Sequence, residues 1–233
     1  MIYVTADLHG CDPRDFQRLL DRAGFGDDDF LFILGDVIDR GNWGAELLLF
    51  LTQQPNIQLI LGNHEAMLLS CGFLFQEVSE ESLEALTVEQ INLMQTWLDN
   101  GGGPTLKGFQ KLLKQDPEAV EGILDYLNDA PLFEALEVNG TDFVLVHSGL
   151  GNFQAERPLD DYSSEELLFQ RPGLDTRYFS NARVIFGHTP TQFYGASGKA
   201  VHTDTWTCID TGAAMGQNPM VLRLDDMKEF YLE

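Results

Sequence analysis

The chain has 233 residues, of which 44% are hydrophobic and 22% are charged, proportions typical of a globular protein rather than a disordered or fibrous one. Its formal net charge is -23 at pH 7, and no cluster of lysine or arginine offsets it, which excludes nucleic acid as a partner. An acidic chain that handles phosphate groups needs bound divalent cations to reverse the local potential.

The N-terminus and the cysteines indicate a compartment. No basic segment precedes a long apolar stretch, and no apolar run approaches the ~18 residues of a membrane span, so we expect neither a secretory signal nor a membrane partner. The three cysteines, Cys11, Cys71 and Cys208, form no CxxC pair, which argues against a disulfide framework and a thiolate zinc site. We therefore expect a cytoplasmic protein.

Short β-rich runs alternate with amphipathic stretches of helical length at the start of the chain. Strands are predicted at 2–5, 30–34 and 57–61, and helices are predicted from Pro13 and across 46–51. The strand at 30–34 is wholly apolar, which suits a sheet that is covered on both faces. This alternation predicts βαβ units and a parallel sheet.

Only helical periods occur from about residue 73 to residue 128, with Ser79 and Thr87 as candidate caps and a break at 101–104. Strands return at 133–138, 143–146, 184–186, 207–209 and 220–222. We therefore predict one domain over 1–233 with an α/β fold. In this fold two mixed sheets pack face to face between outer helices, in four layers, and a helical cap is inserted at about 73–128.

Strong metal-binding and hydrogen-bonding side chains fall just past the ends of these strands, where open α/β sheets place their active sites. The first three strands are followed by Asp7 and His9, by Asp36, Asp39 and Arg40, and by Asn63 and His64, and two later strands by His147 and His188. A lone Asp-x-His is more typical of a helix N-cap than of a ligand pair. Capping does not explain why four of the five histidines recur at strand ends.

This set of residue types suits a particular chemistry. Carboxylate, imidazole and amide ligands without thiolate bind divalent ions such as manganese, iron or zinc, rather than calcium or a structural zinc. Two such ions ~3.5–4 Å apart can activate a water molecule and clamp a phosphoryl group, and they need a shared carboxylate. Asp36, which follows the middle strand, is the predicted bridge.

Several motifs carry a resemblance to a known family. The runs DLHG at 7–10, GDVIDRG at 35–41 and GNHE at 62–65 resemble the three signature blocks of the calcineurin-like metallophosphoesterases. HSGL from His147, FGHTP from Phe186 and IDTGA from Ile209 are similar to later blocks of one branch, the serine/threonine phosphoprotein phosphatase (PPP) family with its small bacterial members. The resemblance runs from Tyr3 to about Ala213 and implies the calcineurin-like metallophosphoesterase fold.

The resemblance also implies roles for the matching positions. One metal, manganese or alternatively iron or zinc, would be held by Asp7, His9 and Asp36, and a second by Asp36, Asn63, His147 and His188. A water molecule between the metals would attack phosphorus in line, with no phosphoenzyme. His64 would protonate the leaving oxygen, Asp39 would orient His64, and Arg40 and Arg171 would bind phosphoryl oxygens.

This sequence departs from the family pattern near both arginines. Asn42 and Trp43 stand where the family usually has proline and a short polar residue, so the turn beside Arg40 is expected to differ. Phe169 stands where tryptophan is common, close to Arg171, and Ala6 stands where glycine is usual. The expected roles of the two arginines depend on these local turns.

Three functions are open at this point. The leading expectation is a dimetal phosphatase that hydrolyses phosphomonoesters on serine or threonine of proteins, or on small esters. The alternative is a hydrolase of dinucleoside polyphosphates such as diadenosine tetraphosphate. Members of that group typically carry other residues at the positions of Asp39 and Glu65, so both positions favour the phosphatase. A catalytically inactive adaptor is disfavoured because the chain keeps every expected ligand, His64 and Arg40. The oligomeric state and the natural substrate stay open.

Overall fold

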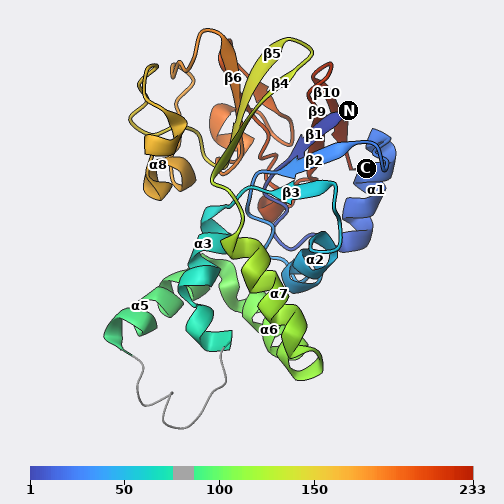
Figure 1. Ribbon diagram of the computed structural model, residues 1–233, viewed down its shortest axis with the longest axis vertical. Coiled ribbons are helices and arrows are strands. Elements are labelled where there is room, and N and C mark those ends of the chain that lie inside the picture. Colours follow the sequence, from blue (N-terminus) through green and yellow to red (C-terminus); the bar gives the residue numbers. More distant parts are fainter. Residues whose placement is uncertain (76–86, 233) are drawn as a thin grey trace.

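The strands of the computed structural model, which describes residues 1–75 and 87–232, form two mixed five-stranded sheets (Figure 1). The first sheet has the order β10-β9-β1-β2-β3, and its strands are β1 (Ile2–Thr5), β2 (Phe30–Ile33), β3 (Ile57–Leu59), β9 (Met220–Arg223) and β10 (Lys228–Tyr231). The second has the order β4-β5-β6-β8-β7, and its strands are β4 (Phe133–Val138), β5 (Thr141–Val146), β6 (Ala182–Phe186), β7 (Val201–His202) and β8 (Trp206–Cys208). The predicted fold class is confirmed.

Parallel pairing brings the loops that follow the strands to one edge of each sheet. In the first sheet β1 pairs with β2 and β2 with β3, all parallel. In the second sheet β5 pairs with β6 and β6 with β8, again parallel. Each sheet therefore directs the segments after three of its strands toward the same end of the molecule.

Alternate side chains of the strands enter two different hydrophobic clusters. Val4 and Phe32 pack with Leu145 and Ile185 of the second sheet, in the layer between the two sheets. Tyr3 points the other way, into a cluster with the helices. Since successive side chains of a strand point to opposite faces, the first sheet is buried on both faces, as its apolar sequence predicts.

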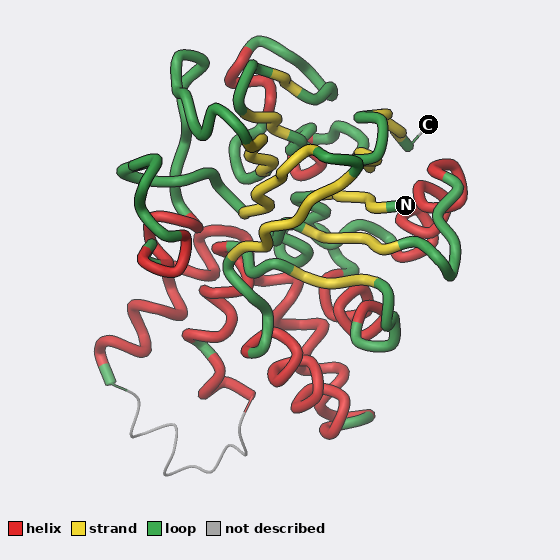
Figure 2. Tube along the Cα trace, turned by 45° about the horizontal axis from the view of Figure 1, so that its top comes forward, coloured by secondary structure: helices red, strands yellow, loops and turns green. Residues whose placement is uncertain are grey.

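The outer face of the first sheet is covered by α1 (Pro13–Ala23), α2 (Gly44–Leu51) and helices of the middle segment. Helix α1 begins with a proline in its first turn behind an Asp12 cap and ends at Gly24, whose φ is 75°. The second sheet is covered differently: its outer cluster takes side chains from loops and from the short α8 (Ser164–Leu168). Figure 2 shows most helices on one side and mainly loops on the other.

Helices dominate the middle segment, as predicted. They are α3 (Asn63–Ser70), η1 (Gly72–Phe75), α5 (Val88–Trp97), η2 (Leu98–Gly102), α6 (Gly103–Gln115) and α7 (Pro117–Asn128), which lie below the sheets in Figure 1. The expected break at 101–104 is a kink, in which Gly101 has a φ of 105° and Pro104 sits in the first turn of α6. Thr87 caps α5 as predicted, whereas Ser79, with the rest of 76–86, lies outside the described residues.

Side chains of the middle segment join the helical cluster on the first sheet. Trp97 and Phe109 are fully buried there together with Leu31 and Ile33. The helices of this segment thus pack directly against the sheet that carries the first predicted ligands.

The division of the chain into one domain stays a prediction. Across 1–75 and 87–232, every helix is too short or too polar to span a bilayer.

Candidate metal centre

Four of the predicted ligands occupy a strained backbone conformation directly after their strands. Asp7, His9, Asp36 and His188 have φ values of 54°, 42°, 54° and 61°. Residues other than glycine rarely adopt positive φ, and such strain persists where the surrounding structure enforces it, often at functional sites. Here the His9 amide donates to the Asp36 carbonyl at 2.8 Å, and the Asp7 amide to the Gly35 carbonyl at 3.1 Å. The loops after β1 and β2 therefore hold each other in place.

Asp36 lies between two groups of ligand atoms. Among the described residues, the ligand atoms of His9, Asp36 and His64 lie within 4.8 Å of one another, and so do those of Asp36, His147 and His188. Oδ2 of Asp36 is 3.7 Å from Nε2 of His9, while its Oδ1 is 3.4 Å from Nε2 of His147. The two carboxylate oxygens thus face opposite groups, which is the geometry that a bridging ligand requires.

Backbone carbonyls set the tautomers of two of these histidines. Nδ1 of His9 lies 3.0 Å from the Ile38 carbonyl, and Nδ1 of His147 lies 2.7 Å from the Leu34 carbonyl. A carbonyl oxygen only accepts, so each Nδ1 carries the hydrogen and each Nε2 offers a lone pair. Burial lowers the pKa of His9 to about 4, and burial next to His147 lowers the pKa of His188 to about 3. Both imidazoles are therefore neutral near pH 7, the form that binds metal.

The second group contains an arrangement that fits a cation. Oδ1 of Asn63 lies 2.8 Å from Nε2 of His147 and 2.9 Å from Nδ1 of His188. The amide oxygen and Nε2 of His147 both present lone pairs, because the hydrogen of His147 is on Nδ1. A shared divalent cation would stabilise two lone pairs at this distance. The residues present therefore fit the ion that the resemblance implies.

Asp7 is placed differently from the other expected ligands. Among the described residues it belongs to neither group of converging ligand atoms, and its carboxylate accepts the His188 amide at 2.9 and 3.0 Å. Burial, together with the nearby Asp210 and Asp36, raises the pKa of Asp7 well above its usual value. Without a cation, the buried carboxylates of Asp7, Asp36 and Asp210 disfavour the charged form of one another. Because Asp7 lies outside both groups of ligand atoms, its role as a ligand stays a prediction.

His64 lies in contact with Asp39 and Arg40 at the first group. Nδ1 of His64 lies 2.7 Å from Oδ2 of Asp39, and Arg40 Nη2 lies 3.1 Å from Nε2 of His64. Arg40 Nη1 is also 3.1 Å from Nε2 of His9. Burial alone lowers the pKa of His64, but the carboxylates of Asp36 and Asp39 outweigh it and raise this pKa above its usual value. The sequence predicted the Asp39 contact, but not that His64 lies among the ligand atoms.

Two buried acidic residues, Glu65 and Asp210, lie at the site although neither was predicted to be a ligand or a catalytic residue. Glu65 accepts hydrogen bonds from the amides of Asp36, Val37 and Gly62 at 2.8, 2.8 and 3.1 Å, which ties α3 to the loop after β2. Asp210 is also buried, and burial raises its pKa to about 7. Glu65 ends the GNHE motif and Asp210 lies in the IDTGA motif, so these two motifs are the sequence signal that could have identified them.

A cavity of about 480 Å³ opens over these groups. Its polar floor includes His9, Asp36, Asn63, His64 and His188, with Arg40 and Arg171 beside them. Its other wall is formed by Pro172, Thr189, Pro190, Phe193, Tyr194 and Met215, and Asn100 completes the lining. The structure thus brings both predicted phosphate-binding arginines to one cavity with the predicted ligands.

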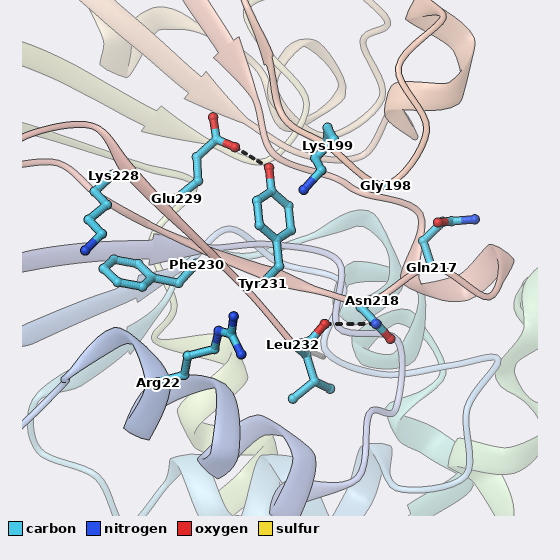
Figure 3. A pocket seen from close by; sticks show the side chains of 10 residues that line it. All are labelled: Arg22, Gly198, Lys199, Gln217, Asn218, Lys228, Glu229, Phe230, Tyr231 and Leu232. Carbon is cyan, nitrogen blue, oxygen red and sulfur yellow. Dashed lines mark hydrogen bonds between the residues drawn. The ribbon is translucent and has the colours of Figure 1, made fainter.

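A larger cavity, of about 740 Å³, lies beside the C-terminal hairpin β9-β10 and contains none of the predicted site residues. Figure 3 shows its lining, where Tyr231 donates a hydrogen bond to Glu229 and the Lys199 ammonium lies 3.8 Å from the Tyr231 ring centroid. Its ten lining residues include one carboxylate, Glu229, and no histidine, cysteine or aspartate, so this cavity lacks the group of converging ligands found in the first one.

The fold and the site together define a class of protein. The family described as calcineurin-like phosphoesterase matches residues 1–192, and the chain belongs to this family. It is 28% identical over 193 residues to a symmetrical bis(5'-nucleosyl)-tetraphosphatase of Acidovorax sp. (strain JS42), which covers 81% of this chain and 57% of that protein. It is 36% identical over 100 residues to the same kind of protein from Haemophilus ducreyi, covering 41% of this chain and 37% of that protein.

Solved structures agree on the fold. A putative diadenosine tetraphosphatase matches with a TM-score of 0.66 at 16% identity, covering 99% of this chain and 91% of that one. A cold-active protein-tyrosine phosphatase of Shewanella matches with a TM-score of 0.55 at 17% identity, covering 100% of this chain and 80% of that one. At these identities the matches establish architecture alone. The chain spans about half the length of the Acidovorax relative, 57%, and less of the Haemophilus one.

The expectation of a serine/threonine protein phosphatase is wrong. The curated relatives that match across most of this chain are named tetraphosphatases, not protein phosphatases. Asp39 and Glu65 were the two positions that favoured the phosphatase. In the structure Asp39 contacts His64 and Trp97, and Glu65 contacts backbone amides. Both side chains are fully buried and line no part of the cavity, so neither can read the substrate.

Proposed function

We propose that the chain is a metal-dependent hydrolase of dinucleoside polyphosphates, of the diadenosine tetraphosphate type. The observation that carries this proposal is the composition of the cavity, in which two arginines and a metal-binding floor adjoin an apolar wall. A polyphosphate with an aromatic base at its end matches both halves of such a cavity. The tetraphosphatase relatives support the same substrate class.

The proposed cofactors are two divalent ions, manganese first and iron or zinc as alternatives. His9 and Asp36 would hold one ion, and Asp36, Asn63, His147 and His188 the other, with Asp7 as a further ligand. When bound, such ions polarise phosphoryl oxygens and lower the pKa of water, so that water becomes a nucleophile near neutral pH. Asp36 fits both ions because its two oxygens face opposite groups.

The remaining chemistry falls to the side chains. Arg40 and Arg171 bind phosphoryl oxygens through their planar guanidinium groups and hold the phosphate chain over the floor of the cavity. Water attacks one of the two middle phosphorus atoms, and the bond from that phosphorus to the oxygen that bridges the two middle phosphates breaks. His64 donates its Nε2 proton to that leaving oxygen, while Asp39 keeps the ring oriented through Nδ1. Cleavage at the middle bridge releases two nucleoside diphosphates.

A comparison of three substrates tests the proposal. Metal-stripped protein is reconstituted with manganese, and kcat/KM is measured for diadenosine tetraphosphate, a phosphothreonine peptide and p-nitrophenyl phosphate. We expect diadenosine tetraphosphate to give the highest kcat/KM and the Asp36→Asn variant to lose activity on all three. A higher kcat/KM for the phosphopeptide, or metal binding without any turnover, would reject the proposed function.

A further inference from the structure

Two large apolar side chains stand exposed at the wall of the cavity. Phe193 is 71% exposed and Met215 is 55% exposed. Of the large hydrophobic side chains exposed in the described residues, these two alone line the cavity that contains Asp36 and His64. Exposing apolar area to water is unfavourable, so a pair gathered at a phosphate-binding cavity points to an apolar ligand group.

The turn that presents Phe193 is firmly anchored. Phe193 belongs to η4 (Thr191–Tyr194), and its amide donates to the Pro190 carbonyl at 2.9 Å. The next residue, Tyr194, donates its hydroxyl to the Pro172 carbonyl at 2.8 Å, and its ring centroid lies 5.5 Å from that of Trp206. Phe193 therefore has a fixed backbone while its ring is left to solvent.

The turn that presents Met215 is tied to the first. Met215 ends η5 (Ala213–Met215), which lies between Gly212 and Gly216 with φ values of 89° and 83°. The Thr191 amide donates to the Asp210 carbonyl at 2.9 Å, just before that turn. The two apolar side chains thus come from neighbouring turns whose relative position is held by a backbone hydrogen bond.

We propose that Phe193, together with Met215, forms a stacking face for a nucleobase of the substrate. The inference rests on the proposed function and adds the part of the site that would recognise the nucleoside. Every base offers a π-face to an aromatic ring, and a thioether packs well against aromatic groups. Arg40 and Arg171 line the same cavity, so one ligand with an anionic end and a flat aromatic end satisfies both.

The two arginines in the cavity lining limit the chemical classes of ligand that fit it. The whole chain has 14 lysines and arginines against 37 aspartates and glutamates, yet two of the arginines line this cavity. A purely apolar ligand would leave these guanidinium groups unused, and inorganic polyphosphate would leave Phe193 in water. A nucleotide is the chemical class that uses both.

Direct binding tests the stacking face without any turnover of a dinucleotide. Dissociation constants are measured by calorimetry with manganese-loaded protein for adenosine 5'-monophosphate and for ribose 5-phosphate, which has a hydroxyl group in place of the base. We expect the nucleotide to bind more tightly by roughly 5- to 100-fold. Phe193→Ala should bring the ratio of the two dissociation constants close to one without changing the dissociation constant of ribose 5-phosphate. Phe193→Tyr should keep the wild-type ratio. Ile91→Ala, which truncates an exposed apolar side chain outside the cavity, serves as the control.

The outcomes separate this inference from the proposed reaction. Equal binding of the two ligands by the wild-type protein, or a ratio that survives in Phe193→Ala, overturns the stacking face even if diadenosine tetraphosphate is hydrolysed. Loss of affinity for both ligands in Phe193→Ala and in Phe193→Tyr also overturns it, because that pattern belongs to a structural role. A base-dependent ratio without hydrolysis of diadenosine tetraphosphate upholds the stacking face and rejects the reaction.

Discussion

Asp39 and Trp97 meet at a single oxygen next to His64. Oδ2 of Asp39 accepts a hydrogen bond from Nε1 of Trp97 at 2.9 Å and lies 2.7 Å from Nδ1 of His64. Trp97 comes from the helical segment, and the Arg40 amide also donates to a carbonyl of that segment, the one of Gly101, at 2.9 Å. The helical segment therefore holds Asp39 and the backbone of Arg40 in place, and through Asp39 it helps to position His64, the proposed general acid.

Replacement of Asp39 by asparagine removes the negative charge that orients His64 and stabilises its protonated form. We expect Asp39→Asn to lower kcat on diadenosine tetraphosphate by about 10- to 100-fold, because a partner that positions a functional histidine typically contributes this much. KM should change little, since Asp39 does not line the cavity. Steady-state kinetics decide the matter: an unchanged kcat would show that His64 acts without Asp39.

Trp97→Phe removes the hydrogen-bond donor together with the second ring of a fully buried side chain. The free energy of unfolding should fall by at least ~1.5–3 kcal/mol, because the loss of a hydrogen bond to a charged group adds to the cost of the cavity left by the missing ring. The decrease in kcat should be smaller than in Asp39→Asn, because His64 keeps its acceptor. Urea unfolding and kinetics on one preparation measure both quantities. An unfolding midpoint equal to that of the wild type would contradict the buried hydrogen bond.

Gly187 lies against a predicted metal ligand. A Cβ at this position would come within 1.9 Å of Oδ2 of Asp7. We expect Gly187→Ala to displace the Asp7 carboxylate and to lower the number of manganese ions bound per chain, as measured by mass spectrometry of the desalted protein. Gly122→Ala is the matched control, because no atom lies within 4 Å of a Cβ there. Equal manganese content in the two variants would argue that Asp7 is not a ligand.

An ion pair between Arg157 and Glu166 is one of the contacts that hold the segment before Arg171. Glu166 accepts hydrogen bonds from Arg157 at 2.9 Å and from Asn152 at 3.0 Å, and these hold the pKa of its carboxyl well below the usual range. A depressed folded-state pKa stabilises the protein above the unfolded pKa of about 4.3, and this contribution is lost as pH falls through the folded value. Glu166→Gln should therefore lower Tm at pH 7, with the gap to wild type closing in strong acid.

Calorimetric melting curves from pH 3 to pH 7 follow that gap, which should begin to narrow at the acid end of this range, below the unfolded pKa of about 4.3. The comparison uses the difference in Tm between variant and wild type, because acid destabilises both proteins through their other carboxylates. A gap that stays constant over the whole range would indicate a packing effect rather than the loss of a charged acceptor.

Much of the site could be predicted because it follows from strand order. The carboxyl ends of parallel strands share an edge, so acids and histidines after successive strands converge, as His9 after β1 and Asp36 after β2 do. The approach of His147 to Asp36 depends instead on how the two sheets pack against each other. Turn geometry, which has no simple sequence signal, determines the contacts of His64 and the exposure of the Phe193 ring. It also determines where the guanidinium groups of Arg40 and Arg171 lie. The prediction of a protein phosphatase was wrong because it rested on Asp39 and Glu65, which bond only to groups inside the protein.

The kink at Gly101 illustrates the same limit. The run of glycines before Pro104 predicts an interruption of the helix, and the structure keeps the chain helical on both sides of it. The approach of the Gly101 carbonyl to the Arg40 amide is a tertiary contact, which local composition does not encode.

The nucleotides released from diadenosine tetraphosphate reveal which bond of the phosphate chain is cleaved. Manganese-loaded protein and its Asp36→Asn variant are incubated with the dinucleotide, and the nucleotides are separated by anion-exchange chromatography. Attack at the middle of the phosphate chain predicts adenosine diphosphate as the only nucleotide product, and none from the variant. Adenosine monophosphate with adenosine triphosphate would contradict cleavage at the middle bridge, and an intact dinucleotide with the wild-type protein would contradict the proposed hydrolase function.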